Sequence, residues 1–418
     1  MKYIKRNLEE RITTLFDVFP VLTITGPRQS GKSTLIKHYI ENSKEDWIYY
    51  SLDNREQLAR IKNDPTLFVK SFKANIALDE VQKAPELFHA IKEFVDRDPK
   101  FKIILSGSAN FLLLKTITES LTGRVGILEL LPFSFSEWLE LKSNKLIEKI
   151  IAHRNIDSLF DLLLKIKRNK VSYDKLFKFI ISGGYPKISF IKQELQWDWF
   201  QSYITTYIER DLRDFAQIAN LDAFQTVYKA VGFQTGNILN LQNLSSDTGI
   251  STKTIKQYIS ILEASYQCKS LPAYYSNTRK QLIKKPKVFY LDTGIINYFY
   301  QNKNVDELIN CGKWGAILET FVYLELLKEV KDMSYKPSLH FWRTNSGAEV
   351  DFIINTNKYL YPIEVKAGIK IDSLSIRGLK SFLDAEKNKC PFGIIFYRGE
   401  EFYLPNEKII AIPLNILF

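Results

Sequence analysis

Residues 26–34 read Gly-Pro-Arg-Gln-Ser-Gly-Lys-Ser-Thr, and they begin where a short apolar run, Pro-Val-Leu-Thr-Ile-Thr-Gly at 20–26, ends. The run predicts a buried strand, and the residues from Ser33 to Ile40 predict a helix. A glycine-rich turn between strand and helix lets backbone N–H groups surround phosphate oxygens, and the positive end of the helix faces the anion. The stretch therefore predicts a phosphate loop that binds ATP.

Two side chains of this loop have separate predicted roles. Lys32 is expected to reach the β- and γ-phosphates, and the Ser33 hydroxyl is expected to ligate Mg²⁺. A glycine-rich turn without a ligand is the alternative, which the position between strand and helix disfavours. The predicted nucleotide-binding residues are Gly26, Pro27, Arg28, Gln29, Ser30, Gly31, Lys32, Ser33 and Thr34.

A later apolar run, Ile-Ala-Leu-Asp-Glu at 76–80, ends in two carboxylates. Asp79 is expected to hold Mg²⁺ through water. Glu80 is expected to orient and deprotonate the attacking water, the role of a general base. A solubilising acidic pair is the alternative, and the position on the next plausible core strand after the phosphate loop disfavours it.

Two more positions follow the next predicted strand. In Ile-Leu-Ser-Gly-Ser-Ala at 104–109, Ser108 is expected to hydrogen-bond the attacking water or the γ-phosphate, with Ser106 as the alternative. In Leu-Thr-Gly-Arg at 121–124, Arg124 is expected to reach the γ-phosphate of a neighbouring subunit and to stabilise transition-state charge, which implies a homo-oligomer. A plain strand-to-loop transition and a surface arginine are the respective alternatives.

Strands and helices alternate in the first part of the chain. This order predicts an α/β fold with a parallel sheet and helices on both faces. The four predicted strands are 20–26, 47–53, 75–80 and 101–106.

The pattern changes after about residue 140, where apolar residues recur at helical spacing. Residues 241–264 predict a helix-turn-helix, and a β-rich stretch at 285–292 makes a winged helix the expectation. The α/β pattern returns near residue 310. The predicted domains are an ATPase core at 1–140, a helical lid at 141–220, a winged helix at 221–300 and a terminal α/β domain at 301–418.

The terminal domain contains two acidic stretches, Gly-Ala-Glu-Val-Asp-Phe-Ile-Ile at 347–354 and Tyr-Pro-Ile-Glu-Val-Lys-Ala-Gly at 361–368. Strand alternation places Glu349 and Asp351 on one face, opposite Val350, Phe352 and Ile354. It likewise places Glu364 and Lys366 on one face of the next strand. If the strands pair, Asp351 and Glu364 would ligate Mg²⁺ and Lys366 would stabilise phosphate charge. A cross-strand ion cluster without metal or cleavage is the alternative.

Composition limits the possible classes of protein. The 418 residues carry a net charge of +11, and only three cysteines occur, far apart. No apolar run reaches the roughly 18 residues of a membrane span, and the N-terminal sequence lacks the apolar core of a secretion signal, so a cytoplasmic protein is expected. The basic balance permits binding to a polyanion such as DNA, although a solvated, lysine-rich surface without a partner explains it equally well.

Five motifs occur in order along the chain: the phosphate loop, Leu-Asp-Glu-Val-Gln-Lys-Ala-Pro-Glu-Leu-Phe, Ser-Gly-Ser-Ala, Leu-Thr-Gly-Arg and Leu-Pro-Phe-Ser-Phe-Ser-Glu-Trp. In this series the chain resembles prokaryotic AAA+-like ATPases with a C-terminal domain of uncharacterised function. Gly-Gly-Tyr-Pro at 183–186 and Tyr-Ile-Glu-Arg-Asp-Leu at 207–212 are similar to that family's lid signatures. The resemblance implies an AAA+ core, a lid, a winged helix and a terminal domain like PD-(D/E)XK nucleases. In such a domain Glu319 would be a further acidic site residue.

Two functional hypotheses follow. The first is an ATPase that acts on DNA, because the start of the second helix in 241–264 carries Thr252, Lys253, Thr254, Lys256 and Gln257, which suit phosphate and groove contacts. The second is a nucleotide-dependent switch or scaffold that binds protein and has no nuclease activity.

Overall fold

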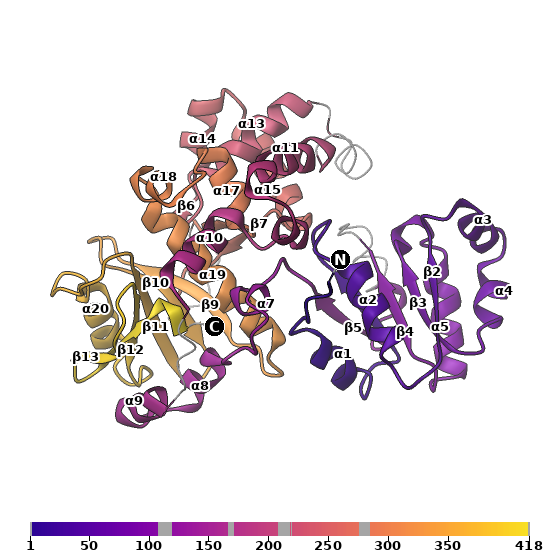
Figure 1. Ribbon diagram of the computed structural model, residues 1–418, viewed down its shortest axis with the longest axis horizontal. Helices are drawn as coiled ribbons and strands as arrows, with labels where there is room; N and C mark the ends of the chain where they lie inside the picture. The colour runs from indigo at the N-terminus through magenta and orange to yellow at the C-terminus, as the bar shows by residue number, and fades with distance from the viewer. Residues whose placement is uncertain are drawn as a thin grey trace. The chain divides into compact units, whose positions relative to one another are not determined.

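The computed structural model describes residues 2–107, 119–165, 171–207, 218, 220–275 and 285–416. The chain forms two compact units (Figure 1). The first unit comprises 1–133, 185–190 and 261–267, and the second comprises 134–184, 191–260 and 268–418. No helix in the described ranges has the length and apolar character needed to cross a lipid bilayer.

A five-stranded parallel sheet forms the centre of the first unit, in the order β2-β3-β4-β1-β5. The strands are β1 (Val21–Thr25), β2 (Trp47–Ser51), β3 (Asn75–Asp79), β4 (Ile103–Ser106) and β5 (Val125–Glu129). The helices are α1 (Glu9–Leu15), α2 (Lys32–Glu41), α3 (Arg55–Asn63), α4 (Pro65–Lys70) and α5 (Leu87–Arg97). The expected parallel α/β sheet is therefore confirmed for this unit.

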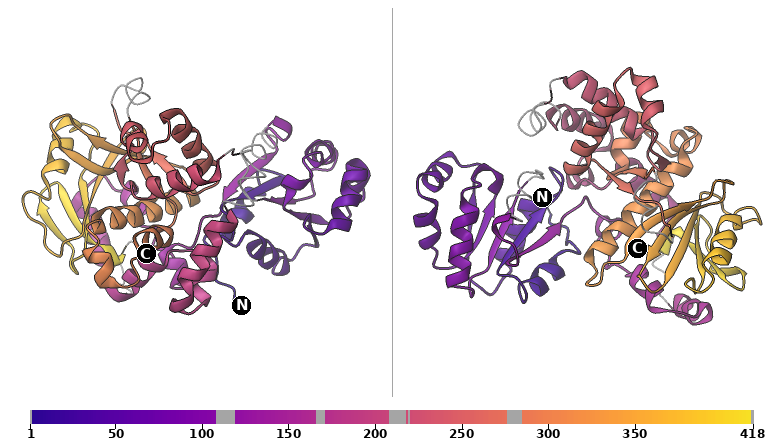
Figure 2. Two further views of the ribbon diagram at one scale, coloured as in Figure 1. Left: turned by 90° about the horizontal axis from the view of Figure 1, so that it is seen from above. Right: turned by 180° about the vertical axis from the view of Figure 1, so that it is seen from behind.

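Helices cover both faces of this sheet (Figures 1 and 2). Leu22 and Ile24 of β1 pack on one side with residues of α1 and α2, while Val21 packs on the other side with α4 and α5. Alternate residues of each strand thus enter two separate cores, which explains why these strands are apolar throughout.

The strand β5 is not among the predicted strands. It lies at the edge of the sheet, and only Gly126 and Leu128 within it are buried. A Cβ atom at Gly126 would lie 2.8 Å from Leu22 Cδ2, so close packing favours glycine at a position where a core strand normally shows an apolar side chain. The hydrophobic alternation that identifies a strand is therefore too weak here to predict one.

Twelve described helices lie wholly or mostly in the second unit. They are α7 (Phe135–Trp138), α8 (Leu146–Ala152), α9 (Ile156–Lys165), α10 (Tyr173–Ser182), α11 (Gln196–Thr206), α13 (Leu221–Gly232), α14 (Leu241–Thr248), α15 (Thr252–Ala264), α17 (Thr293–Tyr300), α18 (Val305–Asn310), α19 (Trp314–Asp332) and α20 (Arg377–Ala385). Residues 261–264 of one of them, α15, belong to the first unit. The expected helix-turn-helix is present as α14 and α15, and Gly249, with φ 70°, ends α14 in the left-handed conformation that glycine adopts without strain.

Two sheets complete the second unit. The small antiparallel sheet has the order β6-β8-β7, formed by β6 (Asn237–Ile238), β7 (Cys268–Leu271) and β8 (Lys287–Tyr290). The larger mixed sheet has the order β13-β14-β12-β11-β10-β9. Its strands are β9 (Ser338–Arg343), β10 (Glu349–Asn355), β11 (Leu360–Lys366), β12 (Gly393–Tyr397), β13 (Tyr403–Asn406) and β14 (Ile409–Pro413).

A bulge in β10 corrects one prediction from strand alternation. The register between β10 and β9 shifts between Val350 and Ile353. Both of these residues pack in the core that α20 covers, whereas Phe352 stacks with Tyr323 of α19 on the opposite face. Phe352 therefore does not share a face with Val350 as expected, because the extra residue of a bulge reverses the alternation beyond it.

Candidate nucleotide site and acidic cluster

The phosphate loop depends on backbone conformations that favour glycine. Gly26 and Gly31 have φ angles of 146° and 94°, and a Cβ atom at Gly26 would lie 2.2 Å from the Leu130 carbonyl oxygen. The buried ammonium of Lys32 donates hydrogen bonds to the carbonyl oxygens of Gly26 at 3.0 Å and Pro27 at 2.8 Å. The loop thus curves around one positive charge, as a phosphate site requires.

Arg6 supports this loop from outside and was not predicted. Its guanidinium donates to the carbonyl oxygens of Ser30 at 2.9 Å and Leu131 at 2.6 Å, and it lies 4.7 Å from the centre of the Phe133 ring. Arg6 is 4% exposed, so these buried contacts stabilise the conformation of the loop. No local pattern marks it, because it lies 24 residues before Ser30.

The two predicted Mg²⁺ ligands meet at one hydroxyl group. Tyr49 of β2 donates a 2.6 Å hydrogen bond to Asp79 Oδ2, and the Ser33 side chain is near enough to this hydroxyl to lower its pKa. Burial, and then the bond to Asp79, raise the pKa of Tyr49, so the hydroxyl is neutral. Ser33 and Asp79 are therefore within reach of one small group, and oxygen ligands so placed fit Mg²⁺. Sequence patterns gave no indication of Tyr49.

Glu80 follows Asp79 in a strained backbone conformation. Its φ of 60° and ψ of 41° lie in the left-handed region, which a residue with a side chain rarely adopts. The Gln82 amide donates to the Glu80 carboxylate, and the Glu80 N–H donates to Asp79 Oδ1 at 3.1 Å. Strain of this kind concentrates at functional sites.

The predicted polar residue on β4 has a different contact from the one expected. The buried Ser106 hydroxyl donates to Asp79 Oδ1, so it orients this carboxylate. Because β4 lies between β1 and β3, Ser106 ends beside both the phosphate loop and Asp79. Ser108, the first choice for contacting the attacking water, lies outside the described residues.

Arg124 is held within its own unit. Its Nε and Nη2 atoms bind the Asp96 carboxylate of α5, at 2.9 Å for Nη2, and Nη1 donates to the Thr122 carbonyl oxygen at 2.9 Å. The hydrogen bond to Asp96 raises the pKa of Arg124. The Arg124 side chain is 34% exposed.

The acidic residues of the terminal domain converge, as predicted, but around a lysine that was not predicted. Lys287 Nζ of β8 lies 2.8 Å from Glu319 Oε1, 2.6 Å from Glu349 Oε1 and 3.8 Å from Asp351 Oδ1. Glu319 comes from α19, and the other two carboxylates come from β10. We call these four residues the lysine-centred cluster. Burial alone lowers the pKa of Lys287, but the three carboxylates outweigh it and raise this pKa.

Glu364 and Lys366 lie beside this cluster on β11. Lys366 Nζ contacts Glu364 Oε1 at 2.7 Å, and Asp351 Oδ2 accepts a 2.8 Å hydrogen bond from the Val365 N–H. Burial, and then the nearby Asp351 carboxylate, raise the pKa of Glu364 to about 8. The Glu364 Oε2 atom is buried without a hydrogen-bond partner among the described residues.

These contacts do not support the predicted metal ion between Asp351 and Glu364. The Lys287 ammonium lies 3.8 Å from Asp351 Oδ1 and closer to Glu319 and Glu349, and Glu364 is paired with Lys366. In the part of the chain that the structure describes, no group of three or more histidine, cysteine, aspartate or glutamate side chains has an arrangement that would hold a metal. The sequence pattern could not show this, because Lys287 lies 32 residues before Glu319.

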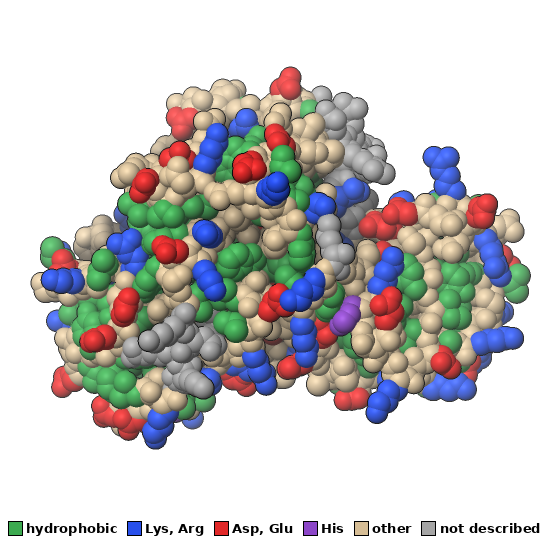
Figure 3. All heavy atoms as spheres, viewed as in Figure 1, with side chains coloured by type: hydrophobic (Ala, Val, Ile, Leu, Met, Phe, Trp, Pro, Cys, Tyr) green, Lys and Arg blue, Asp and Glu red, His purple; other side chains and the backbone are tan. Residues whose placement is uncertain are grey.

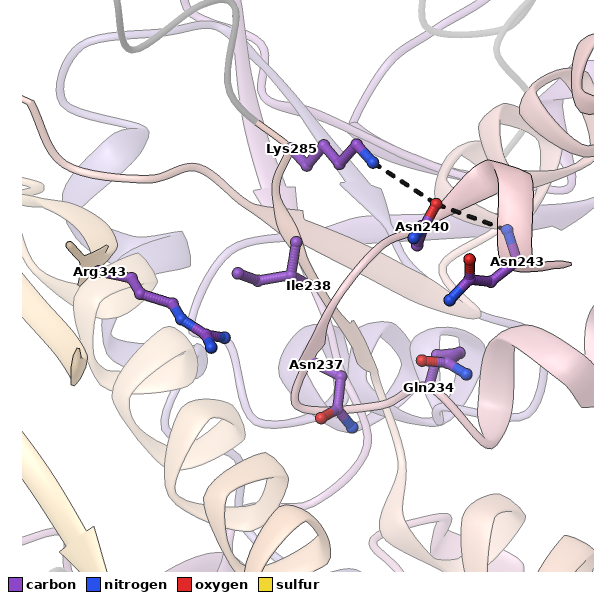
Figure 4. Close-up of a pocket in the computed structure, with 7 residues that line it drawn as sticks. All are labelled: Gln234, Asn237, Ile238, Asn240, Asn243, Lys285 and Arg343. Atoms are coloured by element: carbon purple, nitrogen blue, oxygen red, sulfur yellow. Dashed lines mark hydrogen bonds between the residues drawn. The ribbon is translucent and has the colours of Figure 1, made fainter. Parts of the chain in front are cut away.

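A polar pocket of about 390 Å³ opens near the lysine-centred cluster (Figure 4). Arg343, at the end of β9, lines the pocket and also contacts the lysine-centred cluster, since its Nη1 lies 3.5 Å from Glu349 Oε2. Among the described residues, the lining of the pocket contains two cations and several amides but no carboxylate, which suits an anionic ligand. Its lining residues are Gln234, Asn237, Ile238, Asn240, Asn243, Lys285 and Arg343.

Comparison with known proteins divides the chain into three matched regions. Residues 18–139 match an AAA domain, residues 173–306 match a domain of unknown function (DUF8612), and residues 314–417 match a second such domain (DUF4143).

Several relatives match nearly the whole chain. An uncharacterised protein of Mycobacterium tuberculosis is 24% identical over 413 residues, which cover 98% of this chain and 84% of that protein. One of Methanocaldococcus jannaschii is 25% identical over 427 residues, covering 98% and 87%. The solved structure of a Walker-type ATPase of Pyrococcus abyssi is similar with a TM-score of 0.41 and 15% identity, over 71% of this chain and 96% of that one. The family matches show that the chain contains an AAA-type P-loop ATPase domain followed by two domains of unknown function.

Proposed function

We propose that the first unit binds MgATP and hydrolyses it to ADP and phosphate. The observation that carries the proposal is the convergence of Ser33 and Asp79 on the Tyr49 hydroxyl, next to a loop that curves around the buried Lys32 ammonium. A phosphate loop alone fits any phosphate ligand. A loop with two hard oxygen ligands at its side fits a nucleotide that carries Mg²⁺.

Each residue then has a role that follows from its position. Lys32 neutralises the β- and γ-phosphates, and Ser33 and Asp79 hold the magnesium ion, which offsets charge on the phosphates. Glu80 accepts the proton of the attacking water once its carboxylate leaves Gln82. Arg124 of a neighbouring subunit stabilises the transition state, which makes the active form a homo-oligomer.

Two substitutions at adjacent steps of the reaction test this proposal. Lys32→Ala should abolish binding of a non-hydrolysable ATP analogue, measured by calorimetry. Glu80→Gln should bind the analogue like the wild type but lower the turnover rate by about 10²–10⁴-fold. A wild-type protein that binds no ATP analogue in the presence of Mg²⁺ would contradict the proposal.

We infer that the second unit binds DNA. The order α13-β6-α14-α15-β7-β8, with the sheet order β6-β8-β7, supports the expected winged helix. On α15, Lys253, Lys256 and Gln257 are exposed, as a recognition helix requires. Charge alone does not identify the surface, because basic and acidic side chains are interspersed on the face in Figure 3.

The experiment for this inference measures ATP turnover with single-stranded, duplex and branched DNA, and DNA affinity at several salt concentrations. Phosphate contacts predict an affinity that falls steeply with salt. If no form of DNA binds at low salt, the alternative of a nucleotide-dependent protein-binding switch is favoured. DNA cleavage is not part of the proposal, because the predicted metal ligands Asp351 and Glu364 lie beside Lys287 and Lys366 respectively.

A further inference from the structure

Lys287 occupies a position where lysine is uncommon. It begins β8, the central strand of the small sheet, and it pairs with Ile238 on one side and Leu271 on the other. Its side chain is only 3% exposed. A charged group so deeply buried requires partners of opposite charge. None of its neighbours in the small sheet is acidic, so these partners come from elsewhere in the second unit.

The surroundings of the ammonium group satisfy its charge. Its three N–H groups face three carboxylates, with short contacts to Glu319 and Glu349 and a longer one of 3.8 Å to Asp351. The nitrogen also lies 5.6 Å from the centre of the Phe341 ring, a distance at which an aromatic face attracts a cation.

A divalent metal would need the same carboxylate oxygens. Protein oxygens ligate Mg²⁺ at about 2.0–2.1 Å and Ca²⁺ at about 2.3–2.6 Å. The Lys287 nitrogen already lies 2.6 Å and 2.8 Å from two of these oxygens, so a metal ion among them would nearly overlap the ammonium group. Two neighbouring cations also repel each other. The lysine and the metal are therefore mutually exclusive occupants of one position.

We propose that Lys287 is a built-in cation that replaces a divalent metal in the lysine-centred cluster. In this arrangement the terminal domain holds its carboxylates together without metal, and the same contacts fasten β8 to α19 and β10. The unpartnered Glu364 Oε2 is the one feature that a metal would explain equally well. This inference is independent of ATP hydrolysis and of DNA binding. It can be tested by measuring whether the lysine-centred cluster binds a divalent metal.

The test measures Mn²⁺ binding to the nucleotide-free full chain by electron paramagnetic resonance. All proteins carry Asp79→Asn, so that the phosphate-loop site contributes no metal. With Lys287 present, no Mn²⁺ should bind at this cluster. Lys287→Ala should bind one Mn²⁺ per chain, and the addition of Asp351→Asn should abolish that site. Lys366→Ala is the matched control, because it removes a neighbouring lysine and should open no site.

Every outcome bears on the proposal. A site in the protein that retains Lys287, lost on Asp351→Asn, would overturn it, and this comparison does not require the Lys287 variant to fold. A folded Lys287→Ala protein that binds no Mn²⁺ would also overturn it. A Lys287→Ala protein that folds only when Mn²⁺ is added would support it, because the metal then supplies the missing charge.

Discussion

The Tyr49 hydroxyl donates a 2.6 Å hydrogen bond to Asp79 Oδ2, and the Ser33 side chain is near enough to influence the pKa of the same hydroxyl. These residues come from β2, β3 and the start of α2, and β2 and β3 are neighbours in the sheet. A tyrosine between the two predicted magnesium ligands means that binding of Mg²⁺ with ATP must displace or rearrange its hydroxyl group. Tyr49 thereby becomes a determinant of nucleotide affinity that no motif identifies.

Tyr49→Phe removes this hydroxyl and little else. Because MgATP then has no hydrogen bond to displace, the variant should bind MgATP up to about tenfold more tightly, the equivalent of one hydrogen bond of about 1.4 kcal/mol. Calorimetry with a non-hydrolysable analogue measures this change. The same titration in EDTA is the control and should show equal affinities. Weaker MgATP binding by the variant would show instead that the hydroxyl assists the metal.

The Arg124 guanidinium is bound to Asp96 of its own chain, and its proposed role in a neighbouring active site requires that contact to open. Arg124→Ala should lower ATP turnover by about 10³-fold or more, as loss of an arginine finger does. A mixture of this variant with Glu80→Gln subunits should recover part of the turnover, because some sites then contain both groups. Full turnover by Arg124→Ala alone, or by a chain that light scattering shows to be monomeric, would contradict the role.

Lys253 and Lys256 are exposed on α15, and replacing both with glutamate should weaken DNA binding. Two lost phosphate contacts should also reduce the slope of log affinity against log salt by roughly 1.8. Fluorescence anisotropy with a labelled duplex at several salt concentrations gives both values. The matched control replaces Lys370 and Lys387, which are also exposed on the second unit, with glutamate. An equal loss in both double variants would point to net charge and not to α15.

The Glu329 carboxylate of α19 accepts hydrogen bonds from the N–H groups of Ile147, at 2.6 Å, and Glu148, at 3.1 Å, at the start of α8. Burial raises its pKa from 4.5 to about 7. Between these values the folded state binds more protons than the unfolded state, so the contribution of this residue to stability falls as pH rises. The slope is at most about 1.4 kcal/mol per pH unit, and it vanishes above the folded pKa.

The melting temperature of the wild type minus that of Glu329→Gln should therefore decrease between pH 5 and pH 7 and stay constant above it. Differential scanning fluorimetry across this pH range measures the difference. Glu407→Gln, at an exposed glutamate, controls for general effects of pH. A melting-temperature difference that increases with pH would contradict the raised pKa of Glu329.

Local sequence patterns were sufficient for much of the architecture. The glycines at 26 and 31, the lysine between strand and helix, and the acidic pair at 79 and 80 depend on residues a few positions apart, so their geometry follows from the backbone they build. The antiparallel pairing of β10 with β11, which brings Asp351 toward Glu364 and Lys366, could likewise be predicted from alternation. The bulge in β10 could not, because it depends on which neighbours its residues find in the folded sheet.

The sequence by itself determined the phosphate loop, the acidic strand end and the positions of the terminal carboxylates, because each depends on residues only a few positions apart. Tertiary structure alone decided what faces these groups. Tyr49 reaches Asp79 across 30 positions and Lys287 reaches Glu319 across 32, and no period or spacing in the chain connects either pair. A buried charge takes whichever partner packing brings to it, and here packing brought a lysine to the carboxylates where the pattern alone predicted a metal.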